Sequence, residues 1–287
     1  MKNLKKQSNP YDRLLNVWEE GDEYKMSKKI VFFDIDGTLL HYEHGMNQST
    51  IEGIKELRKQ GHLAFINTGR GRSNISDREL KGLIFDGMIT GCGTYVEYNN
   101  VCLFNHLIEK DLLKRTTDLL GQYQAKVALE GPEKMFYFKR DAMSDDPFIL
   151  YLEKLMGDRL VCVEHWDDEI AVNKISLKMS PEAYGPVYDQ LKEEYEVISH
   201  TDDFYELIPI GYNKATGIQL VCDHLNIPLD NTYAFGDSNN DLDMLRYVKY
   251  GVAMGNSMKE PMEVSDYITD DILNDGIYNA LKYYHLI

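Results

Sequence analysis

Two aspartates stand directly after a short, wholly apolar segment. The segment Ile30–Phe33 has the composition of a strand that is buried on both faces, and Asp34 and Asp36 follow at its carboxyl end. Because side chains alternate along a strand, both carboxylates point to the same side, and Gly37 lets the backbone turn sharply after them. Carboxylates this close repel one another unless a proton or a cation lies between them. The pattern favours a nucleophile beside a general acid, assisted by a hard metal ion, although Asp-Gly is also a common turn dipeptide.

An alternation of strands and helices surrounds this segment and resumes near the end of the chain. Further apolar runs predict strands at residues 62–66, 88–89, 232–235 and 251–254. Apolar residues at helical spacing predict helices at residues 47–60, 215–225 and 241–247. Such an alternation predicts an α/β fold whose core is a doubly wound, parallel, Rossmann-like sheet.

A stretch of different character lies between the two parts of this pattern. It holds no chemical motif, and its predicted helices and strands are at residues 111–123, 134–138, 170–178 and 181–195. We interpret residues 108–201 as an inserted α+β domain, which divides the core into residues 27–107 and 202–287. Residues 1–26 fit neither pattern and are predicted to form an N-terminal extension, with Met26 as an alternative initiator.

The composition limits the classes of function. Lys+Arg 31 against Asp+Glu 47 gives a formal net charge of -16, whereas a general nucleic-acid binder carries a basic surface. No apolar stretch approaches the length that crosses a membrane. The four cysteines have no metal-ligand spacing and are expected to be reduced. We therefore expect a cytoplasmic protein that binds neither nucleic acid nor a membrane; the sequence gives no indication of its oligomeric state.

Four polar signals occur along the core, and three of them directly follow an apolar strand. The carboxyl ends of parallel strands lie at the same edge of a sheet, so we expect these side chains to gather there. Their shared position matters because each signal alone is weak. In chain order they are Asp34-x-Asp36-Gly37-Thr38, Thr68-Gly69-Arg70, Lys214 and Gly236-Asp237-x-x-Asn240-Asp241.

On these four signals, the chain from about residue 28 to residue 287 resembles the haloacid dehalogenase-like phosphohydrolases. The likeness is to the Cof-type subgroup, in which a cap domain is inserted between the second and third motifs. The resemblance implies that Asp34 is the nucleophile, Asp36 the acid and base, and Lys214 the cation that neutralises the phosphate. It implies phosphate or substrate contacts for Thr68, Gly69, Arg70 and Asn240. It implies a magnesium site formed by Asp34, Asp36, Asp237 and Asp241.

The chemistry of these residue types agrees with the implied roles. A carboxylate nucleophile forms an acyl phosphate and so divides one difficult step into two. Phosphoryl transfer needs in-line positioning and neutralised charge on the phosphoryl oxygens. Mg²⁺ suits the cluster because it takes oxygen ligands and keeps several waters. The expected direct ligands are Asp34, the backbone carbonyl of Asp36 and Asp237, with Asp241 acting through water.

The sequence therefore predicts a Mg²⁺-dependent phosphatase that hydrolyses a small phosphorylated metabolite, such as a sugar phosphate, through an aspartyl phosphate. Two other functions stay open, namely a phosphomutase on the same scaffold and a non-enzymatic metabolite-binding protein. Simpler interpretations also stay open for single residues: a helix cap for Thr68 and Asn240, a solvated position for Lys214, and a surface salt bridge for Arg70. Lys174 and Lys178 are weaker candidates for the role of Lys214, because they fall inside the insertion. Residues of the insertion that could face the site are Glu130, Tyr137, His165 and Trp166.

Overall fold

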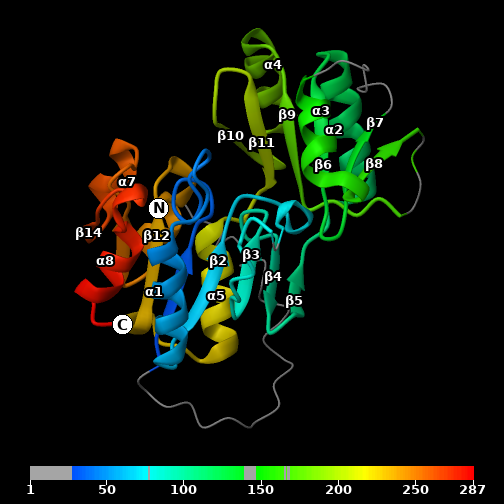
Figure 1. Cartoon of the computed structure of the whole chain (residues 1–287). Coiled ribbons are helices and arrows are strands. Elements are labelled where there is room, and N and C mark those ends of the chain that lie inside the picture. Colours follow the sequence, from blue (N-terminus) through cyan, green and yellow to red (C-terminus); the bar gives the residue numbers. More distant parts are fainter. Residues whose placement is uncertain (1–27, 77, 139–146, 165, 167–168) are drawn as a thin grey trace, which may run out of the picture.

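Two β-sheets organise the protein, one in the core and one in the inserted segment (Figure 1). The structure is a computed structural model, and it describes residues 28–76, 78–138, 147–164, 166 and 169–287. The predicted N-terminal extension, including Met26, lies outside the described residues. None of the helices in the described ranges is long and apolar enough to cross a membrane.

The first sheet is mostly parallel, with an antiparallel edge. Its strands, in order across the sheet, are β14 (Tyr267–Ile268), β13 (Tyr250–Ala253), β12 (Thr232–Gly236), β1 (Ile30–Phe33), β2 (Leu63–Asn67), β3 (Gly87–Thr90), β4 (Tyr95–Tyr98) and β5 (Val101–Asn105). The strands from β14 to β3 run parallel, whereas β4 and β5 add antiparallel pairs. The predicted α/β fold is confirmed. The β4–β5 hairpin was not predicted; its turn places Asn99 and Asn100 at positive φ, which asparagine tolerates.

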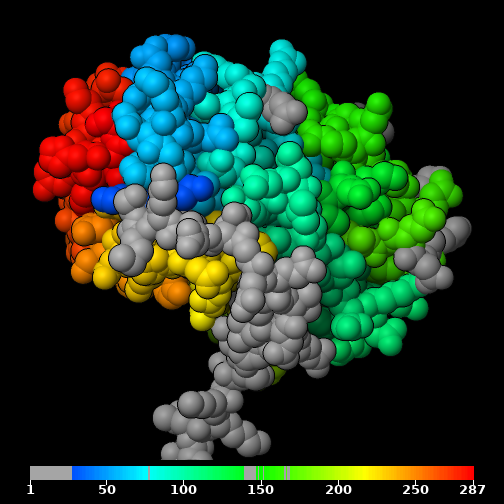
Figure 2. Space-filling view, turned by 90° about the horizontal axis from the view of Figure 1, so that it is seen from below, coloured from blue at the N-terminus to red at the C-terminus, as the bar shows by residue number. Residues whose placement is uncertain are grey.

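Helices cover both faces of this sheet, as the apolar composition of β1 requires. On one face, Val31 and Phe33 pack in a cluster with α1 (Gln48–Lys59) and α8 (Gly276–Tyr283). On the other face, Phe32 packs in a cluster with α5 (Lys214–Leu225) and α6 (Leu242–Tyr247). The short helix α7 (Lys259–Val264) lies beside α6 and β13. Figure 2 shows α1 in blue beside α8 in red, with the green inserted segment at the opposite side of the molecule.

The second sheet, with its helices, forms the inserted cap. Its strands, in order, are β10 (Tyr195–Ser199), β11 (Phe204–Pro209), β9 (Lys174–Lys178), β6 (Lys126–Glu130), β7 (Met135–Phe138) and β8 (Leu160–Val163). Two helices, α2 (Lys110–Gln122) and α4 (Pro181–Leu191), pack on one face, and α3 (Pro147–Met156) packs against β6 and β7 on the other. Because β11 belongs to this sheet, the cap domain that we propose ends near Pro209, beyond the boundary at residue 201 expected from the sequence.

Two predicted elements of the cap differ from the observed ones. The strand expected at 170–178 begins only at Lys174, and the helix expected at 181–195 ends at Leu191 before β10 starts at Tyr195. In both cases the apolar pattern continues into the neighbouring segment, because Ile170 and Tyr195 also pack in the cap core. The apolar sequence pattern therefore follows burial, which continues beyond the end of the strand or the helix.

Candidate active site

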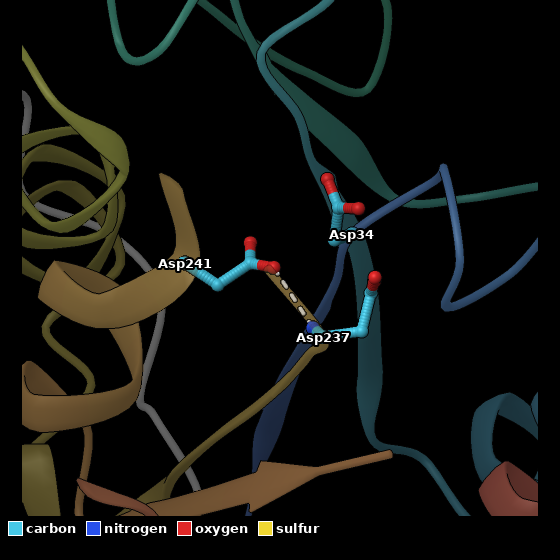
Figure 3. A group of neighbouring side chains, drawn as sticks. All are labelled: Asp34, Asp237 and Asp241. Carbon is cyan, nitrogen blue, oxygen red and sulfur yellow. Dashed lines mark hydrogen bonds between the residues drawn. The ribbon is translucent and has the colours of Figure 1, made fainter. Parts of the chain in front are cut away.

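Three aspartates converge where β1 and β12 end. The two strands are parallel neighbours, with Phe33 beside Phe235, so Asp34 and Asp237 leave the sheet at the same edge. Asp241 follows one short turn later. One carboxylate oxygen from each aspartate lies within 4.8 Å of the others, and Figure 3 shows the three carboxylates gathered around one space. The predicted gathering at the strand ends is therefore present in the structure.

The turn after β1 is shaped to admit Asp237. Gly37 has a φ of +83°, and a Cβ at this position would lie 2.3 Å from Asp237 Oδ2. Only glycine combines this backbone conformation with so close an approach. The next residue, Thr38, is fully buried, and its Oγ1 donates a hydrogen bond of 2.8 Å to Asp237 Oδ1. The Asp36-Gly37-Thr38 segment thus forms a turn and also holds Asp237 in place.

Lys214 is the cation of the cluster. It is the first residue of α5, whose N-terminus is fixed by a capping box between Asn213 and Thr216. Its Nζ donates to Asp34 Oδ1 at 2.7 Å, to Asp241 Oδ1 at 2.5 Å and to Asn240 Oδ1 at 3.1 Å. The side chain has no exposed surface, so the alternative of a solvated lysine is wrong.

Asp241 holds the backbone segment that carries Asp237. It is fully buried, and its Oδ2 accepts hydrogen bonds from the backbone N–H groups of Asp237 (2.9 Å, dashed in Figure 3) and Ser238 (3.0 Å). Its Oδ1 is held by Lys214. Both oxygens therefore already have partners, which agrees with an indirect role for Asp241 beside a metal.

The electrostatics of the cluster leave its negative charge incompletely balanced. Burial raises the pKa of Asp34 well above its usual range, although the charge of Lys214 opposes this. Burial and the neighbouring Asp241 raise the pKa of Asp237 to about 7. Burial opposes the charged form of Lys214, but Asp241 and Asp34 outweigh it and raise the lysine pKa. Three carboxylates share one lysine, and a bound divalent cation would favour their ionised forms.

The donor set therefore fits Mg²⁺. The three aspartates offer only oxygen ligands, and Gly37 allows the backbone after Asp34 to approach them closely. Carboxylate and carbonyl oxygens are the ligands that Mg²⁺ takes, together with water. Burial and then the neighbouring carboxylates raise the pKa values of Asp34 and Asp237, and a bound cation would oppose both effects.

Asp36 points to a different partner. Its carboxylate forms a bidentate ion pair with Arg70, at 2.7 Å to Nε and 2.5 Å to Nη2. Arg70 also pairs with Glu79 at 3.2 Å. Burial opposes the charge of Arg70, but these partners raise its pKa. The salt-bridge interpretation of Arg70 therefore holds in this structure, although its partner is the candidate acid and base.

The loop after β2 lies beside the cluster. Thr68 is buried, and its Oγ1 accepts a hydrogen bond of 3.2 Å from the backbone N–H of Arg70, which closes a tight turn. The short helix that follows is capped at Gly71, so Thr68 is not its cap. Nor is Asn240 a cap, because Ser238 holds that position. A Cβ on Gly69 would lie 3.4 Å from Asn240 Nδ2, so these parts of the second and fourth signals meet.

A cavity of about 640 Å³ lies between this edge of the core and the cap. Asp34, Asp36, Thr68 and Asn240 line it from the core, together with Gly69, Arg70, Asn74 and Ser238. From the cap, the lining consists of Ala128, Glu130, Met135, Pro147, Leu152, Leu155, Ser176, Lys178, His200, Phe204 and Glu206. Of these, only Glu130 was expected from the sequence to face the site; Tyr137 and Trp166 do not line the cavity, and His165 lies outside the described residues.

Alternation along the cap strands could have found some of the missed residues. On β9, Lys174, Ser176 and Lys178 are polar, whereas Ile175 and Leu177 between them pack with α2 and α4. The polar side chains therefore share the opposite face of the strand. The pattern does not reveal that this face lies over the core site.

A Rossmann-like core, an inserted cap and a buried lysine among three aspartates define a cap-bearing hydrolase. The chain belongs to the haloacid dehalogenase-like hydrolase family, whose model matches residues 31–281. The match includes all four signals and the inserted segment.

Individual relatives extend this likeness over nearly the whole chain. YkrA of Bacillus subtilis, a suggested phosphatase, is 30% identical over 268 residues, which cover 90% of this chain and 98% of YkrA. The 5-amino-6-(5-phospho-D-ribitylamino)uracil phosphatase YitU of the same organism is 26% identical, covering 89% of this chain and 97% of YitU. Among solved structures, the sugar phosphatase BT4131 is 27% identical with a TM-score of 0.77, covering 91% of this chain and 100% of that one.

Proposed function

We propose that the protein is a Mg²⁺-dependent phosphatase that hydrolyses a small phosphorylated metabolite through an aspartyl phosphate on Asp34. The observation that carries this proposal is the cluster of three aspartates around a fully buried lysine. Phosphoryl transfer depends mainly on positioning and on neutralising charge, and this cluster is built for both. The relatives named as phosphatases support the same reaction class.

Asp34 is the proposed nucleophile because it lines the cavity and its orientation is fixed. Lys214 engages Oδ1, so Oδ2 is the oxygen available for in-line attack on phosphorus. Attack would form the Oδ2–P bond and break the bond from phosphorus to the leaving oxygen. Water would then cleave the acyl phosphate and release inorganic phosphate. Thr68, Gly69 and Asn240, which line the same cavity, are proposed to contact the phosphoryl oxygens.

Asp34, the backbone carbonyl of Asp36 and Asp237 are proposed to hold Mg²⁺ directly, and Asp241 through water and through its hold on Asp237. Bound there, the metal ion would neutralise the phosphoryl oxygens and the excess carboxylate charge.

Asp36 is the proposed general acid and base, and its pairing with Arg70 sets a condition for this role. A carboxylate held in a bidentate pair with guanidinium only accepts hydrogen bonds, so it cannot donate a proton to a leaving oxygen. Asp36 must therefore exchange Arg70 for a proton before the first step. After that step it would take a proton from the attacking water.

The proposed substrate is a sugar phosphate or a similar small metabolite. A cavity of about 640 Å³ has room for such a leaving group beside the phosphoryl group, and it offers apolar and polar walls. YitU and BT4131, by their names, act on a ribitylamino-uracil phosphate and on sugar phosphate. We also propose a cytoplasmic location; the four free cysteines fit a reducing compartment.

Release of free phosphate from a panel of phosphorylated metabolites tests the proposal. The protein is first treated with EDTA and then assayed with and without added Mg²⁺, with Asp34→Asn as the inactive control. Phosphate release that needs both Asp34 and Mg²⁺ supports a phosphatase. Transfer of the phosphoryl group to another hydroxyl of the substrate without free phosphate would instead indicate a phosphomutase. Binding without either reaction would indicate a metabolite-binding protein.

A further inference from the structure

A buried cluster of charged side chains lies on the face of the cap that covers the core. Lys174 is fully buried, and its Nζ forms an ion pair with Glu206 and lies 3.4 Å from Glu130 Oε1. Glu130 Oε1 also accepts a hydrogen bond from Ser176. The strands β11, β9 and β6 are adjacent, and residues two apart share a face, so these side chains meet above the site.

Two members of the cluster reach across to the loop after β2. Lys174 Nζ donates a hydrogen bond of 2.8 Å to the carbonyl oxygen of Gly69. The backbone N–H of Gly71 donates a hydrogen bond of 2.7 Å to Glu130 Oε2. A Cβ on Gly71 would lie 2.7 Å from that same oxygen, so the loop can approach this closely only without a side chain. The cap thus holds the backbone on both sides of Arg70.

The geometry of this loop matters for two parts of the proposed reaction. Thr68 and Gly69 line the cavity where the phosphoryl group is expected, and Arg70 holds the carboxylate of Asp36. A shift of the loop would therefore move the proposed phosphate contacts and the partner of the proposed acid at once.

Burying these charges carries a desolvation cost that an apolar contact would not have. Removing charges from water is expensive, and replacing a buried ion pair by apolar residues is often neutral or stabilising. Burial opposes the charged form of Glu206, yet Lys174 and His200 lower its pKa to about 2, so the carboxylate stays ionised. The hydrogen bonds to Gly69 and Gly71 are directional, so these charged side chains can hold the loop in one position, which apolar packing alone would not do.

We propose that Glu130 and Lys174 of the cap are positioning residues that hold the Thr68–Gly71 loop in its phosphate-binding geometry. The inference rests on the proposed function for the role of the loop, and it makes the cap part of the phosphate site rather than only a selector of leaving groups. The effect should therefore appear with any phosphate ester, including one whose leaving group makes few contacts with the cap.

The test compares three substitutions of Glu130 in the full-length protein. Glu130→Ala removes the acceptor for Gly71, Glu130→Asp keeps the charge beside Lys174 but draws the acceptor back, and Glu130→Gln keeps an oxygen at nearly the same place. Glu193→Ala, an exposed position between α4 and β10, is the matched control. We expect the Ala and Asp variants to lower kcat for p-nitrophenyl phosphate and to weaken inhibition by inorganic phosphate, each by roughly tenfold to a hundredfold.

Glu130→Gln should retain most of both properties, as should the control. A purely structural role would lower the melting temperature of the variants and leave the inhibition constant for phosphate unchanged, and that result would overturn the inference. So would a change confined to the ranking of metabolites. If the wild-type protein hydrolyses nothing, the proposed function fails; calorimetric titration with inorganic phosphate and Mg²⁺ still tests the loop, and equal affinity in wild type and Glu130→Asp refutes it.

Discussion

Replacing Asp237 by Asn should stabilise the metal-free protein at neutral and higher pH. The Asn side chain has nearly the same shape and can still accept the hydrogen bond from Thr38 Oγ1. It carries no charge, so it removes one of the carboxylates that repel each other beside Asp34 and Asp241. Removal of a proposed metal ligand would thus increase stability while it abolishes activity.

The magnitude follows from the raised pKa of Asp237. In the folded, metal-free protein this pKa is about 7, against an ordinary value of 3.8 that the unfolded chain is expected to have. Between pH 4 and pH 7 the unfolded state releases a proton that the folded state still holds, so the free energy of unfolding falls as pH rises. At about 1.4 kcal/mol per pKa unit, the loss above pH 7 is on the order of 4 kcal/mol. The Asn variant avoids this loss.

Urea unfolding in EDTA at pH 5 and pH 8 measures the effect. We expect the difference in unfolding free energy between Asp237→Asn and wild type to be larger at pH 8 than at pH 5. Adding Mg²⁺ should stabilise wild type more at pH 8, because metal ligands must be deprotonated, and should stabilise the variant little. Asp230→Asn, at an exposed position with no part in the site, is the control. A variant that is less stable than wild type at pH 8 in EDTA would refute the reasoning.

Three further predictions concern the reaction. Asp34→Asn should form no phosphoenzyme, whereas Asp36→Asn should accumulate it with an activated substrate. The reason is that loss of an acid and base slows hydrolysis of the acyl phosphate by roughly a hundredfold to ten-thousandfold. Intact mass spectrometry after rapid quenching distinguishes the two variants. Lys214→Met should abolish turnover and lower the free energy of unfolding by about 3–5 kcal/mol in chemical denaturation, because it leaves Asp34 and Asp241 buried without their cation. Ca²⁺ should support less phosphate release than Mg²⁺ after EDTA treatment, because its looser coordination does not hold the in-line geometry.

Much of the core could be predicted because its signals are local. Ile30–Phe33 is a buried strand, and Asp34 follows at its end, so the position of the carboxylate depends only on strand geometry and on parallel pairing. The same reasoning brings Asp237 to the same edge. It could not show that Asp36 pairs with Arg70, because that contact depends on how two loops 34 positions apart in the chain fold against each other.

The sequence by itself thus determined the α/β core and the set of polar residues at the strand ends, because hydrophobic periodicity and parallel strands require few long-range choices. The family was indicated separately, by the resemblance of the four motifs. The tertiary structure decided which side chains complete the site. Lys174 reaches Gly69 across 105 positions of sequence, and Glu130 reaches Gly71 across 59. Alternation along β6 and β9 assigns these residues to a face, but only the packing of the cap on the core decides that the face meets the loop after β2. The partner of a buried charge, and therefore what that charge does, depends on this packing.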